Sequence, residues 1–147
     1  MSKLVKLELY NQQDVLNDKE VIELNTDAKL YYKNEVLYLI FTIDSKDKIQ
    51  IKYFPAGNKL KIIRYGETSY NLDFIENKFI DSTINTNYGF IKFKLFTYDI
   101  SVEADQELEA ADEIRVDLDY LLVHKNIEPI RNNLNLKVET KEQDLHG

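Results

Sequence analysis

Residues 90–102 read FIKFKLFTYDISV, and this stretch decides the fold. The apolar residues at positions 91, 93 and 95 share one face of an extended strand, whereas those at 98, 100 and 102 share the other. A straight strand cannot bury both sets, because a slip of one residue turns every side chain to the opposite face. A β-bulge or sharp bend near Phe96–Thr97 resolves this conflict. Such bends allow a long strand to turn the corner of a closed barrel.

On both sides of this stretch, apolar and polar residues alternate with the period of two that is typical of half-buried strands. Between Ile75 and Phe79, the pair Glu76-Asn77 predicts a tight hairpin turn. The segments that we expect to form strands are approximately 5–9, 21–32, 36–43, 49–53, 59–65, 70–74, 78–85, 90–102, 114–122 and 130–138.

The pattern predicts an all-β fold, a single antiparallel β-barrel of about eight to ten strands with at most one short helix. A closed barrel is favoured over a β-sandwich because the sequence has long alternating segments and a bent strand. Such strands can close into a barrel, and closure removes exposed edges. We expect one domain over residues 1–147, with a core at about 3–140 and a polar tail at 141–147. Residues 103–113, EADQELEAADE, are the only stretch suited to a linker or short helix. They lack the spacing and the glycine of a calcium loop, so we expect a solvated loop there.

The composition argues against several classes of protein. Lys plus Arg number 19 against 26 Asp plus Glu, a net charge of −7, whereas a nucleic-acid binder needs a basic stripe. We therefore expect no nucleic-acid partner and no membrane partner, since the longest apolar run, Val36–Phe41, is far short of the ~20 residues that span a bilayer. The absence of Cys excludes disulfides, thiolate nucleophiles and iron–sulfur clusters. The first residues contain no apolar run suited to a signal peptide, so we expect a cytoplasmic protein.

The order of these segments is similar to that of a known family. Arg64-Tyr65-Gly66 precedes a polar–apolar strand, and Thr86-Asn87-Tyr88-Gly89 opens the long bent strand. With the surrounding strands, from about Lys3 to Thr140, the chain resembles the YwiB-like family of uncharacterised bacterial proteins, a domain of unknown function. The resemblance implies a calycin-like (lipocalin-type) β-barrel and a bacterial cytosolic setting. It implies no activity, and no catalytic residue is carried over from it.

Arg64 is the charged residue with the clearest functional potential. Its parity matches that of Leu60 and Ile62, so the guanidinium faces inward if those residues do. An inward Arg at a barrel mouth suits a carboxylate or phosphate ligand, which its planar fork binds through two hydrogen bonds. The alternative is an Arg that reaches solvent, or one paired internally with Glu67 or Asp73.

Tyrosines are the second source of candidate binding residues. Ten Tyr and seven Phe are spread over nearly every expected strand, and in a small barrel such side chains mostly fill the interior. Tyr88 precedes Gly89 at a bend, where a packing role competes with contact to a ligand. The alternative to a filled core is a pocket lined by Tyr38, Tyr53, Tyr65, Tyr70, Tyr98 and Tyr120. The ligand-binding residues that we predict are Arg64, Tyr65, Tyr70, Tyr88 and Tyr120.

Three functional hypotheses remain open. The first is a non-catalytic binding module for a small, partly apolar ligand in the barrel interior or at its mouth. It predicts a cavity of about a few hundred cubic ångströms with Arg64 among its polar groups, and an interior filled by side chains would contradict it. The second is a solid-core interaction or structural protein. The third, an enzyme, lacks a nucleophile–base pair, a metal-ligand set and a phosphate-binding loop. We therefore expect no catalytic residue, no metal and no cofactor, and we leave a homodimer open as a partner.

Overall fold

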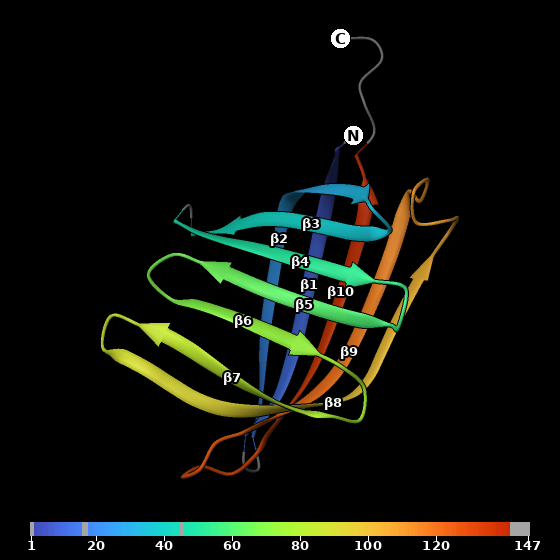
Figure 1. The fold of residues 1–147 in the computed structure, drawn as a ribbon. Helices are drawn as coiled ribbons and strands as arrows, with labels where there is room; N and C mark the ends of the chain where they lie inside the picture. Colours follow the sequence, from blue (N-terminus) through green and yellow to red (C-terminus); the bar gives the residue numbers. More distant parts are fainter. Residues whose placement is uncertain (1, 16–17, 45, 142–147) are drawn as a thin grey trace.

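The computed structural model describes residues 2–15, 18–44 and 46–141, with the side chain of Val15 excepted. Ten strands form one closed antiparallel barrel in which each strand pairs with its sequence neighbours and β1 also pairs with β10 (Figure 1). The strands are β1 (Lys3–Val15), β2 (Asp18–Lys33), β3 (Val36–Ile43), β4 (Asp47–Phe54), β5 (Lys59–Tyr65), β6 (Ser69–Phe74), β7 (Phe79–Thr86), β8 (Gly89–Ala104), β9 (Glu113–Val123) and β10 (Ile130–Thr140). The predicted all-β barrel is confirmed.

The described residues contain no helix at all, and none of their elements is a helix long and apolar enough to cross a membrane. Strands β3 to β6 run across the barrel in Figure 1, in front of the steeply crossing β1, β9 and β10. The predicted polar tail begins at Lys141, and its residues 142–147 lie outside the described part of the chain.

The predicted break in β8 is present. Its pairing with β9 shifts register between Thr97 and Asp99, so that Leu95 before the bulge and Ile100 after it are both buried. The extra residue restores the inward face after the parity of the apolar residues has changed. This is why sixteen residues of β8 stay in one strand while the sheet bends.

The centre of the barrel is filled by side chains. One face of each strand supplies the core, and Phe74 and Tyr120 meet edge to face there with ring centroids 5.0 Å apart. The space left between the apolar side chains around Leu39, Leu60 and Leu136 is about 20 Å³. That volume holds about one water molecule. The part of the first hypothesis that places a ligand in the lumen is therefore wrong.

The predicted hairpin turn at Glu76-Asn77 is also wrong. Glu76 leaves the β6–β7 pair and bridges Thr97 of β8, and the Asn77 N–H donates to the Thr97 carbonyl at 2.8 Å. The Glu76 carboxylate accepts hydrogen bonds from the Ile100 N–H at 3.2 Å and from Asn58 Nδ2 at 3.1 Å. The bulge in β8 exposes backbone groups that need a partner, and Glu76 satisfies one of them.

Residues 105–112 close the barrel end at which Glu76 lies. This loop is neither a helix nor wholly solvated, because Ala111 is buried and Leu108 packs against the core. The Asp105 carboxylate holds the loop by accepting from the backbone N–H groups of Asp112 and Glu113 at 3.0 and 3.3 Å. The remaining acidic side chains of this loop are exposed, as expected.

Candidate binding cleft at the β6–β7 seam

The barrel wall is incomplete between β6 and β7. The two strands pair only at Ser69 with Asn85 and at Tyr70 with Ile84, after which they diverge (Figure 1). Each keeps a partner on its far side, since β6 pairs with β5 up to Phe74 and β7 pairs with β8 along its whole length. Two strand edges therefore face each other without pairing. We refer to this gap as the seam.

A cleft of about 440 Å³ lies at the seam. Arg64, Tyr70 and Ser82 reach it from the inner face of the wall, because they share parity with core residues of their strands. The other residues that line it come from the outer face and are Ile63, Tyr65, Ser69, Asn71, Asp81, Thr83 and Asn85. The cleft is thus an opening through the wall of a filled barrel.

Arg64 faces inward as predicted, but one edge of its guanidinium is already hydrogen-bonded to Asp47. Its Nε and Nη2 atoms donate to Asp47 Oδ2 at 2.9 and 2.5 Å, and Asp47 is buried. The internal partner is therefore Asp47, and neither Glu67 nor Asp73 plays this part. The signal in the sequence was parity, because Asp47 alternates with Ile49 on the buried face of β4.

Gly66 makes room for this ion pair. A Cβ atom at position 66 would lie 1.9 Å from Asp47 Oδ1, and the backbone there has a φ of +146°. Side chains other than glycine rarely adopt that conformation, and the carboxylate leaves no space for one. The Asp47–Arg64 pair thus depends on a glycine in the β5–β6 turn.

The phenols of Tyr70 and Tyr120 stay protonated near neutral pH. Burial raises the pKa of Tyr70, and the positive charge of Arg64 opposes this only in part. Tyr120 lies deeper, in the core behind Tyr70, and burial raises its pKa strongly. The Tyr70 hydroxyl is therefore available to the cleft both as a donor and as an acceptor.

Ser82 is the site residue that the sequence analysis missed. Only 7% of it is exposed, and its hydroxyl has no hydrogen-bond partner among the described residues. A buried hydroxyl without a partner is costly, and beside an open cleft a bound water or ligand is one way to satisfy it. Nothing in the sequence distinguishes Ser82 from the other polar residues that alternate along β7.

The structure brings three of the five predicted ligand-binding residues together. Arg64, Tyr65 and Tyr70 line the cleft, with Tyr65 half-exposed at the rim. Tyr120 belongs to the core, and Tyr88 lies fully exposed in the β7–β8 turn, outside the cleft lining.

The larger tyrosine pocket does not form, because its members lie on different faces of the wall. Tyr38 stacks on Tyr31 on the outer face, with ring centroids 4.6 Å apart, while Tyr53 faces inward and donates to Asn58 Oδ1. Tyr98 lies on the outer face beneath the Arg131 guanidinium. The six tyrosines lie on six different strands and do not share one face of the wall.

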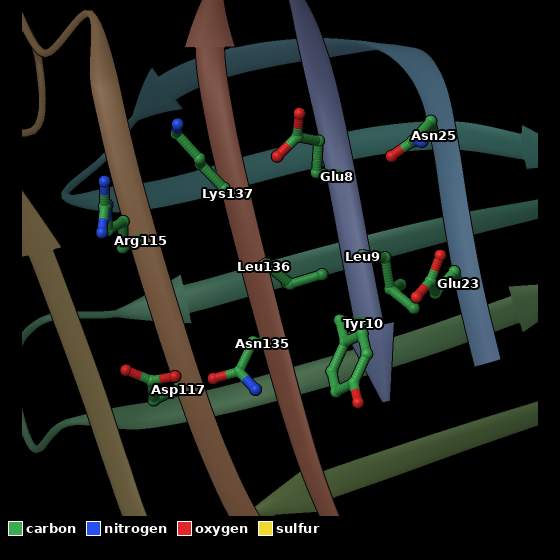
Figure 2. A pocket seen from close by; sticks show the side chains of 10 residues that line it. All are labelled: Glu8, Leu9, Tyr10, Glu23, Asn25, Arg115, Asp117, Asn135, Leu136 and Lys137. Atoms are coloured by element: carbon green, nitrogen blue, oxygen red, sulfur yellow. The ribbon is translucent and has the colours of Figure 1, made fainter. Parts of the chain in front are cut away.

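A second, larger hollow of about 550 Å³ lies on the outer face of β1, β2, β9 and β10, and Figure 2 shows its side chains spread over that face. Its cations already have partners outside the hollow, because Arg115 donates to Glu113 and Lys137 lies 2.9 Å from Glu139. None of its lining side chains is both buried and without a partner among the described residues. The seam cleft is the stronger candidate site.

Within the described residues, no group of three or more His, Asp or Glu is placed to hold a metal ion.

Comparisons with known proteins match a family model and a solved structure. The family model for the domain of unknown function DUF1934 matches residues 7–136. The crystal structure of the ywiB protein from Bacillus subtilis is similar over 96% of this chain and 94% of that one, with a TM-score of 0.79 and 19% sequence identity. At that identity the likeness shows the fold alone. No curated protein matches the chain significantly.

Proposed function

Because the chain belongs to the DUF1934 family of domains of unknown function, its site must be interpreted by chemistry, and we propose that it is a non-catalytic binding module. The ligand is small and partly apolar, and it occupies the seam cleft. The observation that carries this proposal is the Ser82 hydroxyl, buried and without a partner among the described residues, in the lining of a cleft of about 440 Å³. That volume falls in the range of ~300–1,000 Å³ typical of small-molecule sites.

The charges at the cleft favour binding over catalysis. Asp47, the buried acid beside the cleft, accepts two hydrogen bonds from Arg64. The Oδ2 atom of this carboxylate is therefore already engaged by a side chain of the protein itself. The charge of Arg64 in turn is balanced by Asp47, and the Nε–Nη2 edge of its guanidinium is no longer free to bind an anion.

Native mass spectrometry of the purified protein, compared with the denatured sample, tests the proposal. We expect additional mass on the folded protein that disappears on denaturation. The Ser82→Ala variant should carry less of it, whereas Thr97→Val should carry as much as the wild type. Thr97 is the matched control because its hydroxyl is also buried without a partner among the described residues but lies outside the cleft lining. Equal retention by both variants would contradict the site.

The filled core and an aromatic cluster support a second candidate, an interaction protein. On the outer face, Phe96 lies 4.8 Å from Phe79 and 5.0 Å from Tyr98, measured between ring centroids. Phe79 is 61% exposed, and exposed aromatic groups beside an Arg are typical of protein interfaces. Cross-linked pull-downs with wild-type protein and Phe79→Ser test this candidate. A partner, which includes a second copy of this chain, should be lost in the variant. Identical recoveries would contradict it.

A further inference from the structure

We propose that the seam cleft selects an uncharged, hydroxyl-rich ring, of the saccharide class, over an anion. This inference rests on the proposed binding function and names the chemistry of its ligand. It follows from three properties of the cleft: its charge, its hydrogen-bonding groups and its apolar wall.

The charge of the cleft disfavours anions. Arg64 is the only cation in the lining, and its Nε and Nη2 atoms are both engaged by Asp47. Asp81 adds an exposed carboxylate on the opposite strand. A phosphate or carboxylate ligand would meet the Asp81 carboxylate and an Arg whose charge Asp47 already balances, so its desolvation would not be compensated.

The hydrogen-bonding groups suit a ligand that both donates and accepts. The lining contains five hydroxyls and two side-chain amides, from Ser69, Ser82, Thr83, Tyr65 and Tyr70 and from Asn71 and Asn85. Hydroxyl and amide groups can each donate and accept, as sugar hydroxyls do. The Ser82 hydroxyl has no partner among the described residues, and a ligand hydroxyl would supply one. The unpaired edges of β6 and β7 offer further backbone groups beside it.

The apolar wall suits the carbon face of such a ring. Tyr65 is 48% exposed at the rim, and its neighbour Ile63 lines the cleft beside it. A sugar ring presents hydroxyls at its edge and C–H groups on its faces. An aromatic ring next to polar groups provides the complementary pair of surfaces.

An amide NMR titration with five named probes tests this inference. Glucose and maltose represent the proposed class, glucose 6-phosphate is the anionic counterpart of glucose, and phenol and benzoate are apolar-ring probes without the polyol. We expect glucose and maltose to shift the amide signals of residues 63–65, 69–71 and 81–85. Glucose 6-phosphate should bind no more tightly than glucose. Ser82→Ala should weaken maltose binding by about fivefold or more, and Thr97→Val should leave it unchanged.

The outcomes separate this inference from the proposed function. Binding of glucose 6-phosphate about tenfold tighter than that of glucose would overturn the uncharged class. Shifts in the cleft from phenol or benzoate, with none from the sugars, would overturn the ligand class and leave the binding module standing. If none of the five probes shifts the cleft amides, both proposals fall. Should Ser82→Ala fail to fold, Asn71→Ala removes an exposed amide from the same lining and is expected to weaken maltose in its place.

Discussion

Two groups of polar side chains, one at each end of the barrel, differ in whether all of their members have hydrogen-bond partners. At the end closed by residues 105–112, Tyr53 donates to Asn58, Asn58 donates to Glu76 and to the Ile100 carbonyl, and Glu76 accepts from the Ile100 N–H. Each of these side chains has a partner within the network. At the seam end, Asp47 and Arg64 satisfy each other, but Ser82 beside the cleft is left without a partner among the described residues.

The difference distinguishes a structural network from a candidate site. A network in which every side chain has a partner leaves no polar group unsatisfied, so its role is to hold backbone elements in place. The Glu76 network joins the β4–β5 turn to the bulge of β8 and has this character. A hydroxyl without a partner beside an open cleft retains the capacity to bind, and the seam cleft has such a group whereas the larger outer hollow has none among its described lining residues.

The largest expected change in the free energy of unfolding comes from substituting a turn glycine, and it differs between Gly66 at the seam end and Gly57 at the closed end. Gly66→Ala places a Cβ 1.9 Å from the Asp47 carboxylate at a φ of +146°, and we expect a loss of about 3 kcal/mol in the free energy of unfolding. Gly57→Ala, at the closed end, has a φ of +86° but meets only the flexible Lys59 side chain at 3.4 Å, so a loss of about 1 kcal/mol is expected. Urea unfolding followed by circular dichroism measures both. Equal losses would show that the Asp47–Arg64 pair can shift at little cost in free energy and does not determine the structure of the seam end.

The next largest change in stability is expected when an acceptor is removed from the hydrogen-bond network of Glu76. Glu76→Ala leaves the Ile100 N–H without its acceptor and the Asn58 amide with only one of its two acceptors, and we expect a loss of about 2 kcal/mol in the free energy of unfolding. Glu109→Ala, in the exposed part of the 105–112 loop, should change stability by less than about 0.5 kcal/mol. The same urea experiment decides the matter. A loss below 0.5 kcal/mol for Glu76→Ala, on the same scale, would mean that water replaces the carboxylate without cost and that the network is not structural.

The sequence predicted the barrel from one parity conflict, because alternation of side chains is a local property that residues 90–102 carry by themselves. It also predicted the inward face of Arg64 for the same reason. The partner of Arg64 and the open seam depend on neighbours that are distant in the chain. Asp47 meets Arg64 only because β4 and β5 pair in one register. Strands β6 and β7 separate where Glu76 pairs with the bulge region of β8. No local pattern around Glu76-Asn77 predicts this long-range contact.

A smaller effect compares two buried hydroxyls that lack a partner among the described residues. Ser82→Ala and Thr97→Val each remove such a group, so each variant should match the wild type or gain up to about 1 kcal/mol in stability. Ligand retention measured on the same samples distinguishes the two variants, because only Ser82→Ala should retain less ligand than the wild type. A clear loss of stability in Ser82→Ala would instead indicate that an ordered water satisfies the hydroxyl, and Ser82 would then resemble the structural groups of the closed end.

The smallest effect is expected at alkaline pH and concerns Tyr70 at the seam end. Burial raises its pKa in the folded state above the ordinary value near 10. The unfolded chain therefore releases this proton first, so stability is fully present below about pH 10 and declines as the pH rises further. Tyr70→Phe cannot ionise, and it should reduce the loss of stability between pH 8 and pH 10.5 by at most about 1 kcal/mol. Urea midpoints at the two pH values measure this, with Tyr88→Phe in the exposed β7–β8 turn as the control. If Tyr70→Phe and Tyr88→Phe lose the same stability as the wild type, the Tyr70 phenol is hydrated in the folded state, and the seam admits water more deeply than its lining indicates.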